Sequence, residues 1–180
     1  EFIELKGVPN AKVREELARC DFVIDQLYSD TPMAFFATEA AHYGKPAVVG
    51  GYFSACVNQY VHSDDIPPSA YVLPEQLEGT VARLIDDKLY REALGRAARR
   101  FVRERWRSAA VAKRYLALLN DDVPDSWWCS PADISYLGGL GVSDKELRAM
   151  VRYIVDHYGW GALQLQGKAA LKERFARLLS

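Results

Sequence analysis

The chain has 180 residues, 49% of them hydrophobic, and a formal net charge of −1 at pH 7. This length can bury the core of one domain, or of one domain with an appended subdomain. The nearly neutral charge argues against nucleic-acid binding as the main role, because such domains usually carry a strong basic excess. No stretch approaches 18 uncharged apolar residues, so we expect no membrane span.

Apolar runs alternate with helical patterns over the first two thirds of the chain. The expected strands are residues 1–5, 22–27, 46–51 and 70–73. The expected helices cover about residues 9–20, 31–43, 74–87 and 88–119. In the last two of these, one face carries an apolar stripe, made of Leu77, Val81, Leu84 and Ile85, then of Leu89, Leu94, Ala98, Phe101 and Val102. Alternation of this kind predicts an α/β fold with a parallel sheet covered by helices on both faces.

The composition changes after Leu119, where Asp, Pro, Ser and aromatic residues become frequent. Two helical patterns follow, and Ser143 with Glu146 forms a capping box at the start of the first. No strand pattern is present there. We therefore expect two parts: an α/β domain over residues 1–119 and a helical C-terminal subdomain over residues 120–180.

Neither the cysteines nor the histidines are spaced like metal ligands. Cys20, Cys56 and Cys129 lie far apart and form no CxxC pair. This argues against a disulfide scaffold and a zinc site, and it favours a reduced, cytoplasmic setting. We expect no metal and only surface or capping roles for the three histidines.

The predicted sheet suggests where a ligand would bind. In open α/β sheets, ligands bind at the carboxyl ends of the strands, near helix N-termini. Three places meet this rule: the end of strand 22–27, the turn at 30–34 and the loop at 50–53. Thr31 is a suitable N-cap and Pro32 suits the first helical position, so free N–H groups at Met33 and Ala34 would attract an anion such as phosphate.

Glu39 is the one carboxylate in the alanine-rich middle of helix 31–43. It would lie about 12 Å along the helix from Thr31. A half-buried carboxylate needs hydrogen-bond donors, and a ribose diol supplies two. Phosphates at the helix start and a sugar ring at Glu39 describe a nucleotide, although a solvent-facing position is the more common role of a glutamate on a helix.

Residues 2–118 resemble the second half of the C-terminal lobe of GT-B glycosyltransferases. The resemblance rests on IELKGVPNAKVREELARCDFVIDQL, then ATEAAHYGKPAVVGG, then YVLPEQLEGTVARLIDDKLYREALGRAARRFVRERWRSAAVAKRYLALL. It implies a partial Rossmann-like parallel sheet whose first strands are missing. It also implies a nucleotide-sugar donor as substrate, no cofactor, and an acceptor held by a separate N-terminal lobe.

The resemblance further implies roles for individual residues. Glu39 would contact the ribose, and the helix start from Thr31 to Ala34 would contact donor phosphate and sugar hydroxyls. Thr31 stands where the family often has a second glutamate, and the glycine that usually follows is replaced within TPMAF, which puts bulk where the donor sugar often lies. Asp30 is the nearest carboxylate substitute, and Gln26 is a candidate contact for the base or the sugar.

Three interpretations follow. The first is a fragment of a nucleotide-sugar glycosyltransferase, inactive without its N-terminal lobe, which would be supplied in cis or by another chain. The second is a degenerate, non-catalytic nucleotide-sugar-binding or assembly module, favoured by Thr31 and the bulky residues after it. A receiver-like or flavodoxin-like domain is disfavoured, because no acidic cluster follows a first strand. The basic run at 99–107 is either a solvated helix face or a contact for an anionic membrane or acceptor.

Overall fold

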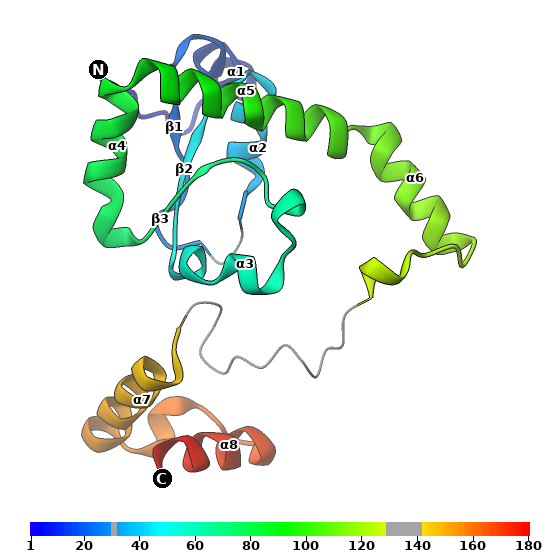
Figure 1. Ribbon diagram of the computed structural model, residues 1–180. Coiled ribbons are helices and arrows are strands. Elements are labelled where there is room, and N and C mark those ends of the chain that lie inside the picture. The colour runs from blue at the N-terminus through cyan, green and yellow to red at the C-terminus, as the bar shows by residue number, and fades with distance from the viewer. Residues whose placement is uncertain (30–31, 129–141) are drawn as a thin grey trace. The chain divides into compact units, whose positions relative to one another are not determined.

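The structure is a computed structural model that describes residues 1–29, 32–128 and 142–180. Contacts divide the chain into two compact units, residues 1–133 and 134–180, which are treated separately below. The helices of the first unit are α1 (Asn10–Arg19), α2 (Phe35–His42), α3 (Val57–Tyr60), α4 (Leu77–Asp86), α5 (Lys88–Arg105) and α6 (Ser108–Leu119) (Figure 1). No helix among the described residues is both long and apolar enough to cross a membrane.

The first unit is built on a three-stranded parallel sheet. Its strands are β1 (Val23–Ile24), β2 (Ala47–Gly50) and β3 (Ala70–Val72), and they lie in the order β1-β2-β3. The register pairs Val23 with Ala47 and Val48 with Ala70. The helical segments between parallel strands return the chain to the starting edge, as parallel pairing requires. The predicted α/β class is therefore confirmed.

Helix α5 contributes to two hydrophobic clusters, one packed on the sheet and the other on α2. In the first, Val48, Ala70, Val72 and Leu84 are buried and pack with Phe22, Leu77, Val81, Tyr90 and Leu94. In the second, Ala41, Ala98 and Val102 are buried and pack with Met33, Phe101 and Trp106. All four residues of β2 are buried, as expected for the central strand of a covered parallel sheet.

Residues 1–5 do not form the predicted strand. They have no regular structure, and the side chains of Phe2 and Ile3 are exposed. A strand needs a neighbour for its backbone groups and a core for its apolar face. β1 pairs only with β2 in the sheet, and no described strand extends the sheet toward residues 1–5. The apolar composition of this segment alone was not enough to predict its structure.

The predicted helix over 88–119 is two helices. α5 ends at Arg105, and α6 begins at Ser108. The ring of Trp106 packs edge-on against Phe101, with centroids 5.3 Å apart, and Trp106 joins the second cluster. This packing holds Trp106 outside helical geometry, so the continuous sequence pattern gave no sign of the break.

The apolar stripes are mostly confirmed, with two errors. Leu84 is buried in α4, and Ala98 and Val102 are buried in α5. Ile85 and Leu89 are exposed instead, although both were assigned to the stripes. They lie at the α4–α5 junction, where the chain turns at Asp87. Their side chains therefore point away from the core.

The second unit is helical where it is described. α7 (Asp144–Tyr158) begins with the predicted capping box, in which the Ser143 hydroxyl accepts from the Glu146 N–H and the Glu146 carboxylate accepts from the Ser143 N–H. The Ser143 hydroxyl also donates to the Glu146 carboxylate, and this bond, together with the one from the Ser143 N–H, lowers the pKa of Glu146. α8 (Ala169–Leu179) is tied to α7 by Arg152, whose guanidinium donates to the Leu179 carbonyl at 2.6 Å.

Candidate functional site

The carboxyl edge of the sheet is formed where β1 and β2 end. The Gly50 N–H donates to the Gln26 carbonyl at 2.6 Å, and the Ser29 N–H donates to the Gly50 carbonyl at 2.8 Å. The Gly51 N–H donates to the Val72 carbonyl at 3.0 Å. These bonds extend the pairing beyond the strands and hold the segment after β1 against the end of β2.

Two glycines allow this close approach. A Cβ at Gly50 would come within 2.6 Å of the Leu27 carbonyl oxygen, and one at Gly51 within 2.2 Å of the Ser29 carbonyl oxygen. Real Cβ atoms do not approach backbone so closely, so any side chain here would push the two segments apart. At this point of the carboxyl edge, the backbone of the segment after β1 therefore lies directly against the backbone at the end of β2.

α2 starts later than the sequence predicted. Its first residue is Phe35, and Ala34 occupies the N-cap position without a side chain that could cap the helix. The Ala34 carbonyl accepts from both the N–H and the hydroxyl of Thr38. Met33 precedes the helix and packs on the second hydrophobic cluster, which holds this segment out of the helix. The prediction that Thr31 and Pro32 start the helix is therefore wrong for Pro32.

The other predicted site residues do not form one binding surface, because each has a different position or role. Met33 is used in core packing, and the alanine at the N-cap position contributes only backbone. The Gln26 side chain is exposed just beyond β1. Asp30 and Thr31 lie outside the described residues. Among the described residues of segment 26–34, the groups that could contact a donor are backbone groups and the Gln26 side chain. No glutamate is present there to bind the sugar.

Glu39 lies four residues after the first residue of α2 and is half-buried. Its charge acts on Arg14 of α1, where it is the smallest contribution to a raised pKa; the largest is the hydrogen bond from Arg14 to the Tyr43 hydroxyl, 3.4 Å long. The glutamate therefore lies within electrostatic range of α1. At 1.5 Å per residue it is about 6 Å from the helix start, half the predicted separation.

Asp25 is a further polar group that the sequence analysis did not single out. It follows β1 directly, and its Oδ2 atom is buried without a hydrogen-bond partner in the described structure. Burial raises the pKa of Asp25, and a hydrogen bond with the Ala37 N–H in the first turn of α2 acts in the opposite direction. A carboxyl group therefore already stands at the helix start where an anion was expected. Its position at the end of an otherwise apolar run was the available signal.

Aromatic side chains are exposed beside this edge. The rings of Tyr28 and Tyr52 lie 6.3 Å apart between centroids, at an angle of 49°. Phe35 is 77% exposed although it begins a helix that packs on the core. These flat apolar surfaces flank the polar groups at the carboxyl edge.

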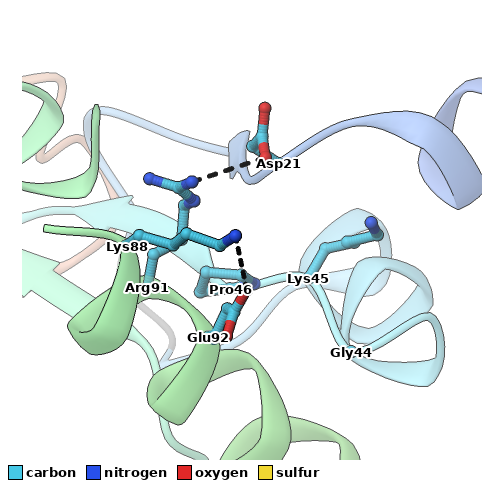
Figure 2. Close-up of a pocket in the computed structure, with 7 residues that line it drawn as sticks. All are labelled: Asp21, Gly44, Lys45, Pro46, Lys88, Arg91 and Glu92. Carbon is cyan, nitrogen blue, oxygen red and sulfur yellow. Dashed lines mark ion pairs between the residues drawn. The ribbon is translucent and has the colours of Figure 1, made fainter. Parts of the chain in front are cut away.

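A pocket of about 260 Å³ lies at the opposite, amino edge of the sheet. Figure 2 shows two ion pairs across it, from Arg91 to Asp21 at 3.6 Å and from Lys88 to Glu92 at 3.8 Å. The lining is completed by Gly44, Lys45 and Pro46, just before β2. Arg91 also donates to the carbonyls of Leu84 and Ile85. Arg91 therefore joins α5 to the end of α4 and to Asp21 before β1, whereas Lys88 and Glu92 pair with each other along α5.

Among the residues that the structure describes, no group of three or more His, Cys, Asp or Glu side chains is arranged to hold a metal ion. No family model matches this chain, and no curated protein or solved structure is significantly similar to it. The candidate site therefore depends on its own geometry, with Asp25 and Gln26 at the end of β1, the first turn of α2 beside them and Glu39 further along that helix.

Proposed function

We propose that this chain is the donor-side part of a GT-B nucleotide-sugar glycosyltransferase, with the nucleotide bound at the carboxyl edge of the sheet. The sequential order β1-β2-β3 supports this, because one half of a doubly wound Rossmann-like sheet has such an order. The observation that carries the proposal is the position of a half-buried Glu39 on α2, the helix that follows β1 and starts at the carboxyl edge.

Each part of the edge has a role in this proposal. Glu39 accepts hydrogen bonds from the two ribose hydroxyls. The N–H groups in the first turn of α2 face the phosphates, because a helix N-terminus favours an anion.

Transfer of the sugar requires a second lobe that holds the acceptor against the donor. We therefore expect nucleotide binding, but no sugar transfer, from residues 1–180 alone. A catalytic base is not assigned, since none of the described residues at the carboxyl edge can be placed against an acceptor.

A non-catalytic nucleotide-sugar-binding module is the second candidate. Met33 favours it, because its side chain fills the core where a transferase would need space and contacts for the donor sugar. The two candidates share the nucleotide site and differ in chemistry. Transfer of radiolabelled sugar by this chain joined to its N-terminal lobe would support the enzyme, and tight donor binding without transfer would support the module.

The nucleotide site is tested by calorimetric titration with uridine, guanosine and adenosine diphosphates and their sugar esters. For a nucleotide that binds, Glu39→Gln should weaken binding about tenfold or more, because hydrogen bonds to a charged acceptor are lost. The 2′-deoxy nucleotide should lose a similar factor with the unmodified protein and little further in the variant.

Glu104→Gln is a matched control, since Glu104 is an exposed glutamate on α5. It should bind like the unmodified protein. Equal affinity of Glu39→Gln and the unmodified protein would remove Glu39 from the site. Failure of every nucleotide to bind would refute the proposal as a whole.

A further inference from the structure

Helix α6 presents an apolar face to solvent. Ala109, Ala112, Leu116 and Leu119 follow one another at spacings of three and four residues, which places them on one side of a helix. Leu116 is 56% exposed and Leu119 is 80% exposed. No residue of α6 is buried, and the half-buried ones, such as Val111 and Ala117, lie on the other side. We call the exposed set, with Tyr115, the outer face of α6.

The charges at the ends of α6 are opposite to those that stabilise a single helix. Arg107 stands at the N-cap, with no acidic residue in the first turn, and Asp121 and Asp122 follow the C-terminus, with no basic residue in the last turn. A helix dipole favours acidic groups at the N-terminus and basic groups at the C-terminus. Arg107, Asp121 and Asp122 also form no ion pair with any described residue.

We propose that two copies of this chain associate by packing the outer faces of their α6 helices antiparallel. A second copy is the occupant that fits, because an antiparallel helix places Arg107 of each copy beside Asp121 and Asp122 of the other. Each helix end then receives the charge that its dipole favours. The proposal does not depend on the proposed function.

Shape supports the same arrangement. With the two helices centred on Arg114, Ala109 of one copy lies opposite Leu119 of the other, and Ala112 lies opposite Leu116. Large residues therefore meet small ones along the whole contact, which allows close packing. The contact is self-complementary, as a twofold symmetric interface must be.

The size of the contact predicts its strength. α6 has 12 residues and is therefore about 18 Å long, so the buried area lies at the low end for specific interfaces. We expect a monomer–dimer equilibrium that shifts with protein concentration and weakens with salt.

Sedimentation equilibrium of the full chain over a series of concentrations tests the proposal. The expected result is an average mass that rises toward twice the monomer mass. The double variant Leu116→Glu with Leu119→Glu should remain monomeric at every concentration. Leu89→Glu is the matched control, because Leu89 is 79% exposed on another helix, and this variant should dimerise normally.

Charge exchange tests the orientation. Arg107→Glu alone should weaken the dimer about fivefold, because two exposed ion pairs become repulsive contacts. Adding Asp122→Lys in the same chain should restore most of the affinity. A monomer at all concentrations, a dimer that survives the double leucine variant, or a charge exchange without restoration would each overturn the proposal.

Discussion

The two edges of the sheet use their polar groups differently. At the amino edge, Arg91 binds two carbonyls at the end of α4 and pairs with Asp21. At the carboxyl edge, Asp25 has a buried oxygen without a partner in the described structure, and Gln26 is exposed. The first edge joins elements together, whereas the second leaves groups available. This difference indicates that the pocket at the amino edge is structural and that the carboxyl edge is the candidate for function.

The largest effect is expected for Gly95→Ala at the amino edge. A Cβ at Gly95 would lie 2.1 Å from the Gly44 carbonyl oxygen and 3.1 Å from Pro46. We expect α5 to be pushed from the turn before β2 and the free energy of unfolding to fall by at least about 2 kcal/mol, as for other overpacked sites. Chemical denaturation measures this change.

Gly79→Ala is the control for Gly95→Ala. Gly79 lies in α4, and nothing stands within 4 Å of its Cβ position. This variant should gain about 0.5–1 kcal/mol, since alanine favours a helix more than glycine does. Equal effects of the two substitutions would show that the α5 contact is not a structural constraint.

The next effect concerns the pocket charges. Arg91→Ala should lower the free energy of unfolding by about 1–2 kcal/mol, because two carbonyls at the end of α4 lose their donor. Lys88→Ala should change it by less than about 0.5 kcal/mol, because its pair with Glu92 is exposed on both sides. Both are read from urea unfolding. A large effect of Lys88→Ala would contradict the distinction between the two pairs.

The smallest effect is expected at the carboxyl edge. The pKa of Asp25 is raised above its ordinary value of 3.8, chiefly by burial. The folded state therefore binds this proton more tightly than the unfolded state, and stability is lost as the pH rises through the folded pKa. Asp25→Asn should raise the unfolding temperature at pH 7, and the gain should shrink as the pH falls through the raised folded pKa and vanish below 3.8.

Thermal unfolding over a pH series checks this prediction, with Glu75→Gln as the control for an exposed carboxyl group. The control should show no comparable pH-dependent gain. A loss of stability in Asp25→Asn at pH 7 would mean that the charged carboxylate is favourable at the start of α2, and the carboxyl edge would then resemble the amino edge.

The parts of the fold that were predicted correctly are those with local signals. The positive φ of Gly44 closes the turn after α2, and the Ser143 capping box starts α7, as their residue types indicate. The strand at residues 1–5 and the single helix over 88–119 were wrong because each depended on distant partners. A strand requires a neighbour, and the break at Trp106 results from packing against Phe101.

The candidate site shows the same division. Glu39 was placed correctly on the helix between two parallel strands, since its helix has a clear apolar and small-residue pattern. The helix start was misplaced, because the packing of Met33 on α5 is not visible in the local sequence. Asp25 was overlooked because its importance comes from burial against α2, which only the folded chain reveals.

The contact between Gly95 and the Gly44 carbonyl also constrains how this chain can diverge. Position 95 can accept a side chain only if the turn at position 44 withdraws, and the turn cannot withdraw without moving Pro46 and the start of β2. The two glycines should therefore covary across homologous sequences, each substitution at one site being accompanied by a compensating change near the other. The crossing of α5 over this turn would be among the slowest parts of the fold to evolve.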